Sequence, residues 1–134
     1  MNISNNYSVA TFSVQIIHIA LSIVWNLVGV YQLGQGVQSI GPTASLIVVA
    51  IMFALAAALY LAAVKSWKWL YLSVSLLLVW GAASAIYGGF TKDVALWPEE
   101  FWRYAGILVN AVGVVGFCMV IANLRRLTDT ATEA

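Results

Sequence analysis

Charged side chains are scarce in this chain of 134 residues. Asp, Glu, Lys and Arg together make up 8% of it, and none occurs from Met1 to Val64, whereas a soluble domain carries about 25%. So few charges cannot cover a surface that faces water. The formal net charge of +1 also leaves no strong field that would attract nucleic acid. We therefore expect a lipid bilayer, and no nucleic acid, among the partners of this chain.

Cysteine is nearly absent too. The single Cys118 cannot close an intrachain disulfide or form a multi-cysteine metal site. The first residues also lack the positive charges of a signal peptide, and the first apolar run, about 21 residues long, exceeds the h-region of such a peptide. We expect the first helix to be retained.

Long apolar runs dominate what is present, since 63% of the residues are hydrophobic. A helix of about 20 apolar residues crosses a hydrocarbon core of about 30 Å, and backbone groups in lipid must bond within their own segment. The sequence predicts an all-α polytopic membrane protein, a single four-transmembrane-helix bundle over residues 1–134 with a short polar tail at 125–134. Its helices are expected at residues 13–33, 44–64, 70–90 and 98–124.

The start of the fourth helix carries its own signals. Pro98 suits the first helical position, where no N–H is needed, and Glu99 and Glu100 suit the first turn because the helix dipole favours negative charge there. Glu99 and Arg103 are four residues apart and are expected to form a pair. Tryptophans concentrate at membrane interfaces, and the expected helix ends carry Trp67, Trp69, Trp97 and Trp102.

The distribution of Lys and Arg predicts orientation, because cytoplasmic loops carry the excess. Lys92 and Arg103 fall at one end of the expected bundle, and four basic residues fall at the other: Lys65, Lys68, Arg125 and Arg126. The four-to-two ratio places both termini in the cytoplasm. We expect a multi-pass protein of the bacterial inner membrane.

Polar side chains in lipid usually face protein, and residues at 100° steps share a face of a helix. The first helix groups Gln15, His18, Ser22, Asn26 and Gly29 in this way. The third groups Ser73, Trp80, Ser84 and Tyr87, and the fourth groups Gly106, Asn110, Gly113 and Phe117. The second has a small-residue face of Ala50, Ala54, Ala57 and Ala58. Small and polar faces let helices approach and bond, so these faces are expected to point inward.

The depths of four polar residues predict a shared cluster. Counted at 1.5 Å per residue, Asn26, Trp80, Ser84 and Asn110 lie within about 6 Å of one another along the membrane normal. They are expected to form one hydrogen-bonded knot, which serves either as structural glue or as a solute site. The full candidate site is His18, Ser22, Asn26, Trp80, Ser84 and Asn110.

His18 is the only side chain in the spans that titrates near neutrality. A proton relay, a metal ligand and a haem ligand are the functional interpretations, and a neutral histidine bonded to a neighbour is the structural one. Zinc needs three or four ligands, whereas only Cys118 lies at similar depth. The spans also hold no carboxylate and no Ser-His-Asp set. We therefore expect no enzyme activity, no cofactor and no metal.

The first helix contains the run Ser22-Ile23-Val24-Trp25-Asn26-Leu27-Val28-Gly29-Val30, and the second loop reads Lys65-Ser66-Trp67-Lys68-Trp69. Both resemble segments of small uncharacterised bacterial four-helix inner-membrane proteins, which carry a Trp-Asn pair followed by Gly-Val in the first helix and a short basic loop after the second. The resemblance implies four helices and marks Trp25, Asn26 and Gly29. It implies no mechanism.

Two functions fit these features. The first is an interaction or accessory protein that self-associates or supports a larger membrane complex. The second is a small-solute transporter or channel acting as an oligomer, with a polar site around Asn26, Asn110 and His18. Ion-coupled transporters typically use a membrane carboxylate, which the spans lack, so the sequence favours the first function. A homo-oligomer or another membrane protein is the expected partner.

Overall fold

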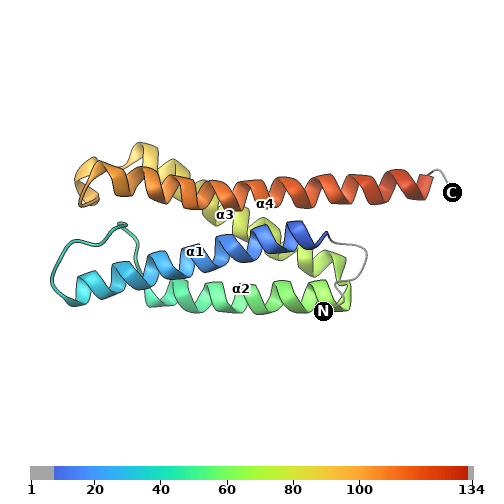
Figure 1. Ribbon diagram of the computed structural model, residues 1–134, viewed down its shortest axis with the longest axis horizontal. Coiled ribbons are helices and arrows are strands. Elements are labelled where there is room, and N and C mark those ends of the chain that lie inside the picture. Colours follow the sequence, from blue (N-terminus) through green and yellow to red (C-terminus); the bar gives the residue numbers. More distant parts are fainter. Residues whose placement is uncertain (1–7, 133–134) are drawn as a thin grey trace.

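The computed structural model describes the backbone of residues 8–132 and the side chains of residues 8–124. The described chain forms four long helices: α1 (Val9–Gly34), α2 (Leu46–Lys65), α3 (Lys68–Thr91) and α4 (Glu100–Thr132), with a short 3-10 turn, η1 (Val94–Leu96), before α4 (Figure 1). All four helices are long and apolar enough to span a membrane. The all-α, four-span prediction is confirmed.

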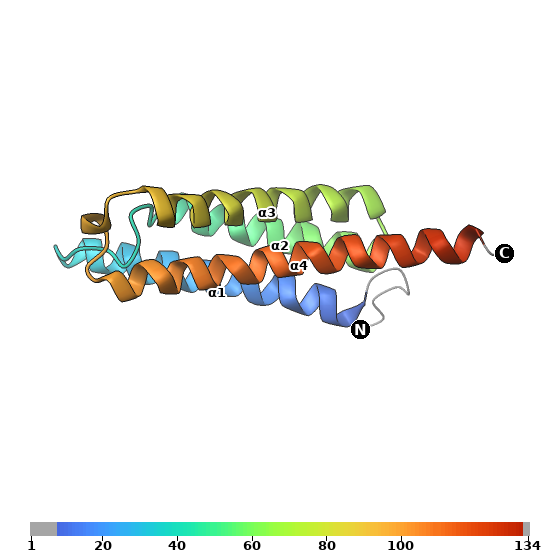
Figure 2. The same cartoon turned by 90° about the horizontal axis from the view of Figure 1, so that it is seen from above.

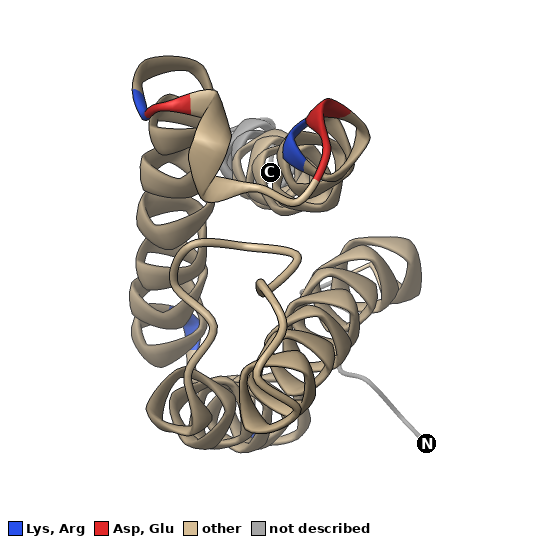
Figure 3. Cartoon of the chain, turned by 90° about the vertical axis from the view of Figure 1, so that its left-hand side faces the viewer, with Lys and Arg blue, Asp and Glu red and all other residues tan. Residues whose placement is uncertain are grey.

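The helices run alternately up and down, so each packs against its antiparallel neighbours in the order α1, α2, α3, α4 and back to α1 (Figures 1 and 2). The start of α1, the end of α4 and the link between α2 and α3 lie at one end, here called the terminal end. The first loop (35–45) and the third loop (92–99) lie at the other, here called the loop end. Viewed onto the loop end, the first loop lies over the centre of the ring of helices (Figure 3).

Local sequence explains where the helices begin and end. The Ser8 hydroxyl accepts the Thr11 N–H at the start of α1, and the Ser45 hydroxyl accepts the Ile47 N–H at the start of α2. Both hydroxyls satisfy backbone donors that have no partner within the helix. Ser66 ends α2 in a left-handed conformation with φ of 59°, which turns the chain directly into α3.

The fourth helix differs from its prediction at both ends. It begins at Glu100, two residues after Pro98, and Arg103 pairs with Glu100 and not with Glu99. It continues through the predicted polar tail to Thr132. At 1.5 Å per residue its length is about 50 Å, well beyond the thickness of a hydrocarbon core. Figure 1 shows α4 extending past the other helices at the terminal end.

The tightest packing lies toward the terminal end. There Ile19 of α1, Leu59 of α2, Tyr71 of α3 and Val120 of α4 are each at most 2% exposed and belong to one cluster. The predicted inward face of α1 is confirmed, because Gln15, His18, Ser22, Asn26 and Gly29 are all buried.

Two predicted faces are wrong. The helix 3 residues Ser73, Trp80, Ser84 and Tyr87 are exposed, and so are Ala50, Ala54 and Ala57 on α2. The inward residues are instead Leu59 and Ala62 on α2, and Val74, Leu78 and Ala82 on α3. Close contact between apolar surfaces orients these two helices, since lipid accepts an indole or an alanine as readily as protein does.

Candidate functional site

The loop half of the bundle encloses a cavity of about 370 Å³. Ligand sites in proteins commonly have volumes of about 300–1,000 Å³. All four helices and both outer loops contribute to its lining. Along α3 the lining runs from Gly81 to Lys92, which corresponds to a depth of about 16 Å. The candidate site is therefore a partly open cavity that extends from the middle of the bundle to the loop end, and its part at the loop end is here called the mouth.

His18 forms part of the inner end of this cavity. The residue is 1% exposed, and its ring packs on α4, where a Cβ added to Gly113 would lie 2.6–2.8 Å from three ring atoms. The amide of Asn110 is close enough to interact with the ring. Neither ring nitrogen, however, makes a hydrogen bond of acceptable geometry to any part of the chain that the structure describes. A buried polar side chain thus lines the cavity, with the Asn110 amide beside it and no hydrogen bond of acceptable geometry at either ring nitrogen.

Trp25, Asn26 and Gly29 fasten the first loop to α1. Asn26 Oδ1 accepts the Ser45 N–H at 3.2 Å, while its Nδ2 donates to the Ser22 carbonyl at 2.8 Å. A Cβ on Gly29 would lie 2.5 Å from Ser39 Oγ. The indole of Trp25 packs edge to face with Trp102 of α4, with ring centroids 6.1 Å apart. These contacts hold the loop as a cover over the mouth of the cavity.

The predicted polar knot is only partly formed. His18, Ser22, Asn26, Ser84 and Asn110 do line the one cavity. Asn110 Nδ2 nevertheless donates to the Gly106 carbonyl of its own helix at 2.8 Å, and Asn26 bonds backbone groups. Both amides therefore bond backbone groups, and no hydrogen bond joins the Asn26 and Asn110 side chains.

Trp80 does not belong to the site. Its side chain is 75% exposed, and it is absent from the lining of the cavity. The indole faces outward from α3, away from the cavity. The prediction that Trp80 joins the polar cluster is wrong.

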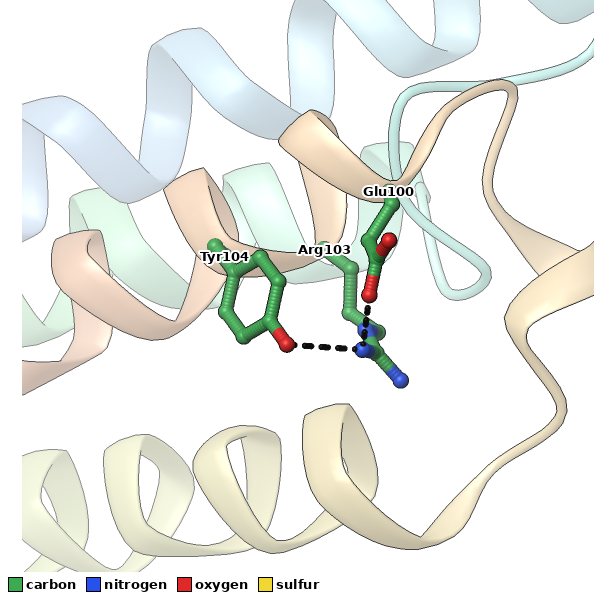
Figure 4. Close-up of polar contacts among 3 residues, drawn as sticks. All are labelled: Glu100, Arg103 and Tyr104. Carbon is green, nitrogen blue, oxygen red and sulfur yellow. Dashed lines mark hydrogen bonds and ion pairs between the residues drawn. The ribbon is translucent and has the colours of Figure 1, made fainter.

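Sequence reasoning missed three residues at the mouth, namely Lys92, Trp97 and Arg103. Trp97, expected at the membrane interface, is 7% exposed. Arg103 extends from α4 into the space beside α3, and its Nη2 donates to Glu100 Oε1 at 2.8 Å and to the Tyr104 hydroxyl at 3.0 Å (Figure 4). Arg103 lies seven residues before Asn110, and this spacing puts both on one face of α4. That spacing is the signal from which its inward position was predictable.

A saturated hydrogen-bond network lies one helical turn below His18. Gln15 Nε2 donates to Ser75 Oγ at 2.7 Å, the Tyr71 hydroxyl donates to Gln15 Oε1 at 2.6 Å, and Ser75 Oγ donates to the Tyr71 carbonyl at 2.8 Å. All three residues are at most 2% exposed. Together with the apolar cluster around them they separate the cavity from the terminal end.

The lining offers cationic and neutral polar groups, with no carboxylate among its described members. Among the residues described, no three His, Cys, Asp or Glu side chains gather closely enough to hold a metal ion. Cys118 is exposed and does not line the cavity with His18. The arrangement is therefore suited to holding a solute through hydrogen bonds, positive charge and apolar contact.

No protein-family model, curated protein or solved structure matches this chain.

Proposed function

We propose that this chain binds a small solute inside the membrane and serves its transport, with the loop-half cavity as the solute site. The observation that carries the proposal is the unpartnered ring of His18 in the lining of that cavity. A buried polar group without a partner costs about 1–3 kcal/mol. A bundle that only had to be stable would fill this position with an apolar residue, and a solute group that bonds His18 offsets the cost.

The cavity has its mouth at the loop end and is closed below His18 by the Gln15 network. A bound solute therefore crosses only when the helices rearrange, or when neighbouring copies complete the path. The positive-inside distribution of Lys and Arg supports placing the terminal end in the cytoplasm of a bacterium and the mouth on the outer side of its inner membrane. A reporter that works only outside the cytoplasm, fused after Ala134, is expected to stay silent.

Filling the cavity tests the proposal. Ser84 is exposed and lines the cavity, whereas Ser73 is an exposed serine of the same helix outside it. Ser84→Phe is therefore expected to remove bound solute, and Ser73→Phe to retain it. The measurement is native mass spectrometry of gently extracted protein, combined with thermal stability against a set of small solutes. Wild-type protein that carries no small molecule and is stabilised by none would contradict the proposal.

Self-association, or an accessory role in a larger membrane complex, is the second candidate. The observation in its favour is the exposed small-residue face formed by Ala50, Ala54 and Ala57 on α2, because small residues let membrane helices approach closely. Ala54→Phe is expected to disrupt such an assembly, and Ile51→Phe, at an exposed position of the same helix outside this face, serves as the control. The mass of the detergent-extracted assembly decides between the outcomes.

A further inference from the structure

The mouth of the cavity has positive charge without negative charge in its lining. Lys92 and Arg103 both belong to the lining, and no Asp or Glu is found among the described residues that form it. The whole sequence has six Lys and Arg residues. Two of these scarce cations therefore line one cavity, and the carboxylate that Arg103 contacts, Glu100, lies outside the lining.

Arg103 has donors to spare. Its side chain is 14% exposed, its Nη2 donates to Glu100 and to the Tyr104 hydroxyl, and its Cζ lies 4.8 Å from the centroid of the Tyr104 ring. The Nε–H is buried and has no partner among the described residues. A guanidinium has five N–H donors in a planar fork, which suits two oxygens of a carboxylate or phosphate. The Glu100 side chain is 62% exposed, and ion pairs at such positions are weak, so Glu100 leaves Arg103 available.

Lys92 lines the same cavity directly after the end of α3. A Cβ added to Gly88 would lie 3.5 Å from Lys92 Cε and 4.0 Å from Nζ, so the Lys92 side chain folds back along the helix beside another residue of the lining. Within the described part of the chain the ion pair is Arg103–Glu100, and Lys92 takes no part in it. Its ammonium group is therefore positioned to bind an anion at the mouth.

The neutral polar groups of the cavity are largely occupied. Asn26 uses both ends of its amide on backbone groups, and Asn110 uses its Nδ2 in the same way. The remaining walls are mostly apolar and include Val48, Met52, Ala85, Ile107 and Val109. A cation would find no carboxylate among the described residues of the lining, whereas an anion with an apolar body matches both its cations and its apolar walls.

We propose that the ligand is an amphipathic anion, with its carboxylate or phosphate at Arg103 and Lys92 and its apolar body against the apolar wall that includes Met52 and Ile107. This inference rests on the proposed function. Ser84 and Ala85 line the cavity and are exposed on α3, and α3 diverges from α2 toward the loop end (Figure 1). A lipid of the adjacent leaflet and a dissolved amphiphile share the required chemistry, an acidic head group on an apolar body.

The test compares four ligands that have eight carbons each and different head groups: octanoate, octyl phosphate, octanol and octylammonium. The protein is placed in phosphatidylcholine nanodiscs, and the dissociation constant is obtained from the rise of melting temperature with ligand concentration. Octanoate and octyl phosphate are expected to stabilise the wild type. Each is expected to bind at least about tenfold more weakly to Lys92→Gln and to Arg103→Gln. Lys68→Gln, which changes an exposed cation at the terminal end, is the control and should bind as the wild type does.

Two further probes separate the sources of the anion. If phosphatidylglycerol in the nanodisc weakens the binding of octyl phosphate, the natural anion is a lipid head group. If inorganic phosphate weakens it, the natural anion is a dissolved one. Binding of octanol or octylammonium as tight as that of octanoate would overturn the anion inference. Octanoate binding that is unchanged in both Lys92→Gln and Arg103→Gln would overturn it too. Lys92 is exposed, so its variant keeps the test valid even if Arg103→Gln fails to fold. If octanol binds and Ser84→Phe abolishes its binding, the cavity still binds a solute and only the anion inference is contradicted. If none of the four ligands binds, both proposals are contradicted.

Discussion

The terminal half and the loop half of this bundle differ in whether their buried polar side chains have hydrogen-bond partners. Gln15 and His18 lie on one face of α1, a single turn apart, and are 2% and 1% exposed. Gln15 makes two side-chain hydrogen bonds to α3, whereas neither nitrogen of His18 bonds any described residue. Burial and polarity are the same at the two positions, so hydrogen-bond satisfaction is what distinguishes a structural polar residue from a candidate binding residue.

The largest expected effect comes from breaking the saturated network. Gln15→Leu removes the acceptor of the Tyr71 hydroxyl and the donor to Ser75, both deep in the core. We expect the free energy of unfolding to fall by about 2–3 kcal/mol, since each lost buried bond has a cost that apolar contact does not replace. Thermal or denaturant unfolding in detergent measures the change. A loss no larger than that of Ser73→Leu, at an exposed position, would show that the network does not stabilise the bundle.

A smaller loss is expected where α4 supports the ring of His18. A Cβ at Gly113 would lie 2.6–2.8 Å from three ring atoms, whereas a Cβ at Gly81 would meet nothing within 4 Å. Gly113→Ala is therefore expected to displace the imidazole, to weaken solute binding, and to lower stability by about 1–2 kcal/mol. Gly81→Ala should leave stability unchanged or raise it slightly, because alanine favours a helix. Melting temperatures of the two variants make the comparison, and equal effects would contradict this account of the packing.

The smallest loss is expected at the cover of the cavity. Asn26→Leu removes the bond to the Ser45 N–H and is expected to lower stability by about 1 kcal/mol, while the first loop loosens. Limited proteolysis within residues 35–45 measures the loosening. Gln35→Leu alters an exposed residue of the same loop and should cleave as slowly as the wild type. Equal cleavage of Asn26→Leu and wild type would mean that Asn26 does not fasten the loop.

The sequence was sufficient for the fold because lipid imposes simple rules. Apolar runs of the required length predicted four helices, and each observed helix overlaps its predicted range. The inward face of α1 was also predictable, because its polar residues are several and fall on one side. The faces of α2 and α3 were not, since Trp80 and the alanine stripe carry no strong preference between lipid and protein.

The site was predicted only in part. His18, Ser22, Asn26, Ser84 and Asn110 line the cavity, as their helical spacing and depth implied. The Gln15–Tyr71–Ser75 network depends on how α1 and α3 pack, which spacing within one helix does not determine. Arg103 was assigned to an interfacial ion pair because a charged residue near a helix end is ordinarily solvated. Its inward direction follows from the tertiary approach of α3 and α4.

The two halves of the bundle are proposed to have different roles, the terminal half as a satisfied core and the loop half as a binding cavity. The most direct measurement compares the unfolding of Gln15→Leu and His18→Leu, prepared in the same detergent without added solute. His18→Leu removes no protein hydrogen bond and puts an apolar side chain at a buried position. The account predicts that His18→Leu leaves the melting temperature unchanged or raises it, while Gln15→Leu lowers it clearly. Equal lowering by the two substitutions would contradict the account, because His18 would then be as structural as Gln15.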